Sequence, residues 1–211
     1  MTLPHENSPV LTAGAKLEEA SAAMILVHGR GASAQDILTL VPYLSVPGIV
    51  FLAPQAEGFT WYPNRFIFPV KQNEPYLSAA LAKVDGLVRQ VAAQGISVER
   101  IFIGGFSQGA CLASEYVIRA PRAYGGLVAF SGGYIGPLGQ ARAAAGRLDG
   151  MPAFIGCSDI DPHIPLERVQ ETTALLTTMG ASVTERIYPK MDHTINDEEL
   201  ELARQLIEKR L

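Results

Sequence analysis

One short stretch, residues 100–112, limits most strongly what this chain can fold into. An apolar, β-branched run leads to Gly105, Ser107 lies between two glycines at the spacing G-x-S-x-G, and a helix-favouring segment covers residues 110–118. The sequence therefore predicts a strand, a sharp turn and a helix in immediate succession. This is the context of a nucleophile elbow, in which a strained turn presents a serine hydroxyl and the glycines allow close backbone approach. The alternative is an ordinary tight turn with a solvated serine.

Further apolar runs alternate with segments of helical periodicity. Runs without polar alternation are typical of strands buried on both faces of a parallel sheet. We expect such strands at 22–27, 49–53, before Gly105, and at 126–130, 151–157 and 183–188, with a weak outer strand at 10–17. Strand and helix alternate about six times, which predicts an α/β fold with a mostly parallel, doubly wound sheet and helices on both faces.

Capping signals mark two of the expected helices. Ser33 and Asp36 form a capping box, and a helix is expected to continue until Pro47 because apolar residues recur on one face, namely Ile37, Leu40, Val41 and Leu44. Asn196 and Glu199 are placed to cap the last helix in the same way.

Length and composition favour one domain over residues 1–211, with residues 1–9 as a poorly ordered leader. The formal net charge is −4, and the charged residues are interspersed, so the sequence has no basic run that would favour binding to nucleic acid or an anionic membrane surface. The apolar runs are too short to span a bilayer, and no signal peptide is apparent. We therefore expect a cytoplasmic protein without stable membrane insertion.

Two cysteines, Cys111 and Cys157, lie in apolar stretches without metal-ligand or redox spacing. Cysteines in such settings are expected to be buried free thiols. The sequence suggests no metal site and no organic cofactor.

A serine hydroxyl needs a base to accept its proton and a third group to orient that base. Among the four histidines, His193 follows the last strand, and so fits the chain order serine, acid, histidine. Three carboxylates compete for the third position. Asp161 is favoured because it follows a strand end and precedes two prolines, whereas Asp192 adjoins the histidine and Asp159 is expected to bond loop amides.

Backbone amides that point at a developing oxyanion complete this kind of site. We expect one from Gln108, directly after the serine, and one from Arg30 in the turn His28-Gly29-Arg30-Gly31. The Arg30 guanidinium is expected to be solvated rather than to bind an anionic substrate. All these motifs follow strand ends, where ligands bind in open α/β sheets.

The connection 54–75 is long and aromatic, with Phe59, Trp61, Tyr62, Phe66 and Phe68 among proline, glycine and asparagine. Connections of this length are usually functional or mobile. We interpret it as one wall of a pocket, although each aromatic side chain has an alternative role as an anchor to the core.

The set HGRG, APQ, TWY, GFSQG, SDIDPHIP and MDHTI, in this order, resembles the phospholipase/carboxylesterase family, which includes bacterial carboxylesterases and acyl-protein thioesterases and is related to dienelactone hydrolases. The resemblance implies an α/β-hydrolase fold without a large cap domain. It implies Ser107, Asp161 and His193 as the catalytic triad and Arg30 with Gln108 as the oxyanion hole. It also suggests substrate contacts at Gly29, Gly31, Trp61 and Tyr62.

These observations predict a serine carboxylesterase for short- to medium-chain esters or thioesters, with an open, shallow site and a small-molecule substrate. Action on lysophospholipids, acyl-proteins or lactones would use the same triad and differ in the pocket. A non-catalytic binding module on the same scaffold is a further alternative, since fold does not dictate function. A homodimer is possible.

Overall fold

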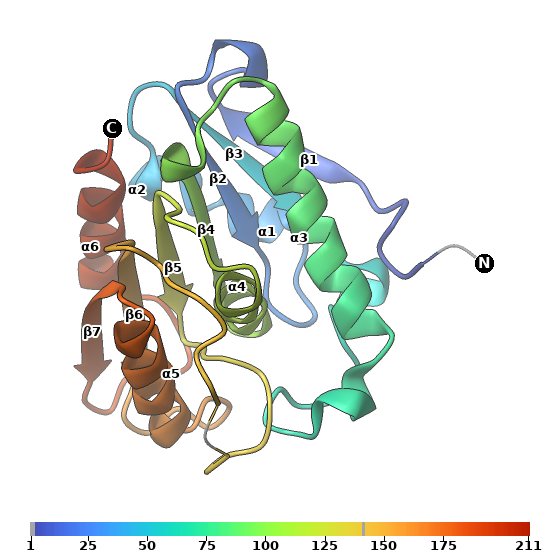
Figure 1. Cartoon of the computed structure of the whole chain (residues 1–211), viewed down its shortest axis with the longest axis vertical. Coiled ribbons are helices and arrows are strands. Elements are labelled where there is room, and N and C mark those ends of the chain that lie inside the picture. The colour runs from blue at the N-terminus through green and yellow to red at the C-terminus, as the bar shows by residue number, and fades with distance from the viewer. Residues whose placement is uncertain (1–2, 141) are drawn as a thin grey trace.

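The computed structural model describes residues 3–140 and 142–211. Seven strands form one sheet in the order β1-β3-β2-β4-β5-β6-β7 (Figure 1). β1 pairs antiparallel with β3, and the other pairs are parallel. The strands are β1 (Val10–Gly14), β2 (Ala22–Val27), β3 (Ile49–Pro54), β4 (Ile101–Phe106), β5 (Gly126–Phe130), β6 (Pro152–Ser158) and β7 (Ser182–Tyr188).

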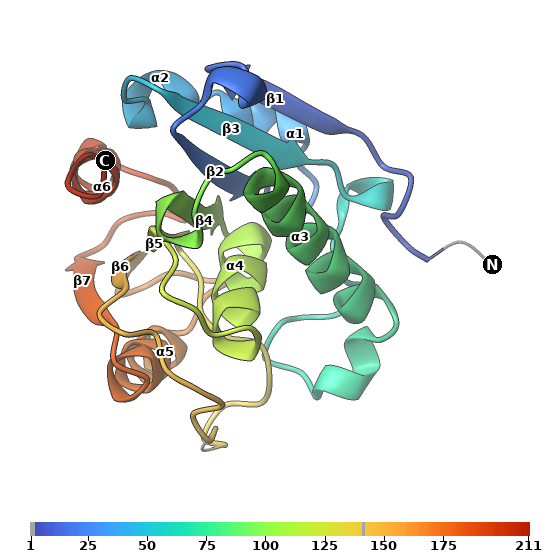
Figure 2. The same ribbon diagram turned by 45° about the horizontal axis from the view of Figure 1, so that its top comes forward.

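Helices cover both faces of the sheet (Figure 2). One apolar cluster joins the sheet to α3 (Tyr76–Ala93), α4 (Gln108–Arg119) and α5 (Leu166–Thr178). The opposite cluster joins it to α1 (Ala34–Leu38), α2 (Val41–Leu44) and α6 (Asp197–Glu208). Short 3-10 helices lie in the connections at η1 (Leu17–Glu19), η2 (Glu57–Phe59), η3 (Val70–Asn73) and η4 (Val98–Arg100).

The burial of the strands follows from their sequences. All six residues of β2, AAMILV, are buried, because helices cover that strand on both sides. β7 at the sheet edge alternates between exposed and half-buried residues, as expected where one face lies near solvent. The predicted α/β architecture with a mostly parallel sheet is confirmed, and no large cap domain is present among the described residues.

The predicted single helix from Ser33 is wrong, because two short helices, α1 and α2, replace it. Pro42 lies in the first turn of α2, where its missing N–H and its ring are tolerated, but in a continuous helix it would clash with the preceding turn. Both predicted capping boxes are confirmed, at Ser33 with Asp36 and at Asn196 with Glu199.

The expected leader 1–9 is only partly described, since residues 1 and 2 lie outside the described ranges. Within it, His5 is packed against the rest of the chain, with 1% of the residue exposed. Its Nε2 lies 3.0 Å from the carbonyl oxygen of Trp61, and its Nδ1 accepts from the Glu57 amide at 3.0 Å. No helix among the described residues has the length and apolar character needed to cross a membrane.

Candidate active site

Ser107 occupies the turn between β4 and α4. Its backbone has φ 56° and ψ −119°, a conformation that costs a non-glycine residue roughly 1–3 kcal/mol. The two flanking glycines explain how the turn fits: a Cβ on Gly105 would lie 2.4 Å from the carbonyl oxygen of Val27, and one on Gly109 would lie 2.1 Å from the same oxygen. Only glycine allows β2 and the start of α4 to approach so closely.

Ser107, His193 and Asp161 are hydrogen-bonded in series. His193 Nε2 lies 2.8 Å from Ser107 Oγ, and His193 Nδ1 lies 2.6 Å from Asp161 Oδ2. Residues that are distant in the chain thus meet beyond the carboxyl ends of β4, β6 and β7. With Nδ1–H donating to the carboxylate, Nε2 is free to accept the serine proton.

The rest of the Asp161 carboxylate is fixed by its own loop. Oδ1 accepts from the amides of His163 at 2.8 Å and Ile164 at 3.0 Å. Burial by itself raises the pKa of Asp161, but the hydrogen bonds from His193 and from these two amides outweigh it, so the pKa lies below its ordinary value. The side chain therefore stays ionised at neutral pH and orients the imidazole.

The other candidates for these positions lie elsewhere. Asp159 Oδ1 accepts from the Lys190 amide at 2.7 Å, which is the loop-bonding role expected for it. Asp192 is exposed. The ring of His163 contacts the His193 ring edge-on, with centroids 4.8 Å apart, and Phe106 packs at the same centroid distance from His193. These two neighbours restrict the orientation of the His193 ring, and the sequence interpretation missed both.

Arg30 and Gln108 line the same cavity as Ser107. Within the described part of the chain, neither amide N–H donates to a protein acceptor. The Gln108 amide is the first of α4, where the helix dipole favours negative charge. Both donors are therefore available to a ligand oxygen beside the serine.

His28 holds the turn that carries Arg30. Its Nε2 accepts from the Ala56 amide at 3.0 Å, so the proton must be on Nδ1, which donates to the carbonyl oxygen of Gly29 at 2.7 Å. Burial lowers the pKa of His28, which keeps the ring neutral and this tautomer fixed. The turn is thereby tied to the end of β3.

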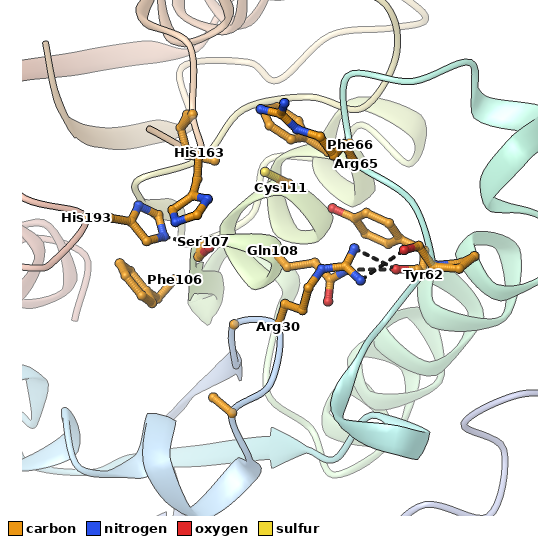
Figure 3. Close-up of a pocket in the computed structure, with 14 residues that line it drawn as sticks. Arg30, Tyr62, Arg65, Phe66, Phe106, Ser107, Gln108, Cys111, His163 and His193 are labelled. Carbon is orange, nitrogen blue, oxygen red and sulfur yellow. Dashed lines mark hydrogen bonds between the residues drawn. The ribbon is translucent and has the colours of Figure 1, made fainter. Parts of the chain in front are cut away.

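The side chains of Arg30 and Gln108 hold one common segment, residues 60–64. The Arg30 guanidinium donates to the carbonyl oxygens of Tyr62 at 2.9 Å and Pro63 at 3.0 Å (Figure 3). It also donates to the carbonyl oxygen of Asn64 at 2.9 Å. The Gln108 carboxamide also donates to the carbonyl oxygen of Tyr62 at 2.9 Å and accepts from the Trp61 amide at 2.9 Å. Arg30 is exposed, in line with the expected solvated side chain, but its three carbonyl partners were not predicted, because only the folded chain brings them within reach.

A cavity of about 360 Å³ opens above Ser107 (Figure 3). Its walls include Gly29, Tyr62 and Phe66, together with residues that the sequence interpretation did not single out for the pocket: Arg65, Phe106, Cys111, His163 and Ile164. Phe106, His163 and Ile164 lie within the motifs GFSQG and SDIDPHIP, Cys111 follows the first of these, and Arg65 lies in the connection 54–75, so position in or beside a recognised segment was the signal that could have found them.

Two residues expected at the substrate site do not line this cavity. Trp61 is fully buried, and its Nε1 donates to the carbonyl oxygen of His28 at 2.9 Å, so it supports the turn from behind. The Gly31 amide donates to the carbonyl oxygen of Phe59 at 2.8 Å. Gly31 has a φ of +76°, so the backbone turns at this residue and Gly31 does not line the cavity. Both act on the shape of the turn rather than on the cavity.

The cysteines are buried free thiols, as predicted. Burial raises the pKa of both Cys111 and Cys157 to about 12, so neither is a thiolate at neutral pH. The described residues contain no group of three or more His, Cys, Asp or Glu side chains that could hold a metal ion.

Comparison with known proteins assigns the chain to a family. The family model for phospholipase/carboxylesterase matches residues 10–211. The chain belongs to this family. Among solved structures, a phospholipase/carboxylesterase from Dyadobacter fermentans is 41% identical, with a TM-score of 0.91 and 98% of each chain covered.

Two further relatives are less similar in sequence. A probable carboxylesterase of Oryza sativa subsp. japonica is 31% identical, with 89% of this chain and 88% of the relative covered. Acyl-protein thioesterase 1 of Saccharomyces cerevisiae is 29% identical, with 74% of this chain and 77% of the relative covered.

Proposed function

We propose that this protein is a serine esterase that hydrolyses carboxylic esters or thioesters through an acyl-enzyme. The observation that carries the proposal is the hydrogen-bonded series from Ser107 Oγ through His193 to Asp161, at 2.8 Å and 2.6 Å, beside two uncommitted amides. Relatives named carboxylesterase and acyl-protein thioesterase support the same reaction class.

Each residue has a defined role in this reaction. His193 Nε2 takes the Ser107 proton as Oγ attacks the carbonyl carbon, and Asp161 stabilises the imidazolium that forms. The amides of Arg30 and Gln108 donate to the oxyanion. His193 then gives its proton to the leaving alcohol or thiol, and a water molecule repeats the sequence to release the acid and restore the serine.

The cavity supports a small-molecule substrate. Its volume of about 360 Å³ suits a short or medium acyl group, and one side opens to solvent. Relatives named for lysophospholipids and acyl-proteins make longer or protein-linked acyl groups the second substrate class. A cytoplasmic location and a homodimer stay predictions.

Steady-state hydrolysis of p-nitrophenyl butyrate by wild type and Ser107→Ala tests the proposal. We expect kcat to fall by about 10⁵- to 10⁶-fold in the variant, since removing the nucleophile removes the acyl-enzyme route. Unchanged turnover in Ser107→Ala would exclude the mechanism, and no turnover by wild type on any ester or thioester would favour a binding module.

A further inference from the structure

The charge of the cavity is opposite to that of the whole chain. The sequence has 21 acidic against 17 basic residues. Yet the charged side chains on the cavity wall are Arg30 and Arg65, and no Asp or Glu lines it within residues 3–140 and 142–211. A concave, cationic site in an acidic protein favours anionic ligands, because the walls concentrate the field of the two guanidinium groups.

Arg65 has a fixed backbone and a free side chain. Buried Asn73 accepts from the Asn64 amide at 2.8 Å and donates to the carbonyl oxygen of Arg65 at 3.4 Å, which anchors the segment to η3. The Arg65 side chain is exposed and extends along the cavity beside Phe66 (Figure 3). Its guanidinium has no carboxylate partner within the described ranges, so its charge is available to a ligand.

Arg30 faces the same cavity with an unneutralised charge. Its three hydrogen-bond acceptors are neutral backbone carbonyls, and no carboxylate pairs with it among the described residues. Tyr62 lies between the two arginines, with its ring on the wall and a hydroxyl that has no partner in the described structure (Figure 3). The two charged groups on this wall can only donate hydrogen bonds, whereas the Tyr62 hydroxyl can donate or accept.

In the proposed reaction, the leaving group and the acyl chain lie on opposite sides of Ser107. His193 must reach the leaving oxygen or sulfur, so the leaving group departs on the His193 side. Tyr62 and Arg65 lie on the other side of the serine (Figure 3), where the acyl chain remains. The wall there combines the apolar ring of Phe66 with the guanidinium group of Arg65 (Figure 3).

We infer that the preferred substrates are esters or thioesters whose acyl chain ends in an anionic group, such as half-esters of dicarboxylic acids. The inference rests on the proposed function and names the substrate class of the same site. The acyl methylenes pack on the apolar wall, and the terminal carboxylate accepts hydrogen bonds from Arg65, with the charge of Arg30 adding attraction.

The test compares kcat/KM for the monoethyl esters of succinic, glutaric and adipic acids with kcat/KM for the ethyl esters of butanoic, pentanoic and hexanoic acids. Each pair has the same acyl chain length, and ethanol release is the readout. For the best chain length, kcat/KM is expected to be about 5- to 10-fold higher for the half-ester. Arg65→Gln is expected to reduce this ratio about 5-fold, the size of one exposed ion pair, and 0.5 M salt is expected to reduce it similarly.

Arg122→Gln is the matched control, because it removes the same charge from an exposed position outside the cavity and should leave the ratio unchanged. A ratio of one or less at all three lengths, or an unchanged ratio in Arg65→Gln, would overturn the inference while neutral ester hydrolysis still supports the proposed function. O-hexanoylglycolate carries its charge in the leaving group, and a higher kcat/KM for it than for the half-esters, measured by acid release, would also overturn the inference. Hydrolysis of neither series would contradict the proposed function and the inference together.

Discussion

Arg30 connects the oxyanion turn to the wall of the cavity, and replacing it with methionine tests what that connection does. The variant keeps most of the apolar stem and removes every donor of the guanidinium. Three hydrogen bonds to the carbonyl oxygens of Tyr62, Pro63 and Asn64 are lost. The Tyr62 oxygen keeps the Gln108 donor at 2.9 Å, and water can reach the other two oxygens.

The loss of stability should therefore be small and the loss of rate larger. Because Arg30 is exposed, we expect a fall of about 1 kcal/mol in the free energy of unfolding. Removal of an oxyanion donor costs about 10²- to 10³-fold in kcat. In Arg30→Met the turn is loosened but is still held through Gly31 and Trp61. We therefore expect kcat to fall about 10-fold, which is a rise of about 1.4 kcal/mol in the activation free energy. KM for a neutral ester should change less than about twofold.

The assay is steady-state hydrolysis of p-nitrophenyl butyrate together with thermal unfolding. Binding of a boronic acid, which mimics the tetrahedral intermediate, should weaken in parallel with kcat. Gln108→Met and the double variant complete a cycle, and the two effects should be non-additive because both side chains bind the Tyr62 carbonyl. Arg89→Met, on the exposed surface of α3, is the control. Wild-type kcat in Arg30→Met would refute the positioning role.

Three further predictions concern other parts of the site and the fold. Asp161→Asn should lower kcat about 10⁴-fold with little change in KM, because an amide favours the wrong tautomer of His193; a fall below tenfold would contradict the assigned role. Burial raises the pKa of Glu199 from 4.5 to about 7, so the folded chain holds a proton that the unfolded chain has lost, and stability should fall by about 3 kcal/mol as pH rises through this window. Urea denaturation at pH 5 and pH 8 should show this fall in wild type and its absence in Glu199→Gln. Gly109→Ala should lower stability by about 2 kcal/mol or more, measured by thermal unfolding, since its Cβ would lie 2.1 Å from the carbonyl oxygen of Val27, and an unchanged melting temperature would contradict the close packing at the elbow.

Much of the fold could be predicted because its signals are local. Runs such as residues 22–27 are apolar throughout and can only be buried on both faces, and the capping boxes at Ser33 and Asn196 mark helix starts directly. The split between α1 and α2 was missed because helical periodicity continues across Pro42, whose effect on the backbone outweighs the pattern.

The site was predictable where residue type and chain order restrict the chemistry. Asp161 was the least certain of the three residues, since three carboxylates lie near the expected loops and only tertiary structure decides which reaches His193. The side-chain roles of Arg30 and Trp61 could not be predicted, because their partners are backbone carbonyls distant in sequence. The cationic wall formed by Arg65 likewise depends on how the connection 54–75 folds over the serine.

Covalent labelling by a fluorophosphonate tests most directly whether His193 activates the hydroxyl in this turn. One label per chain is expected on the peptide that contains Ser107, with none in Ser107→Ala and labelling slowed at least about 100-fold in His193→Ala. Labelling of another residue, or equal rates in wild type and His193→Ala, would contradict the account.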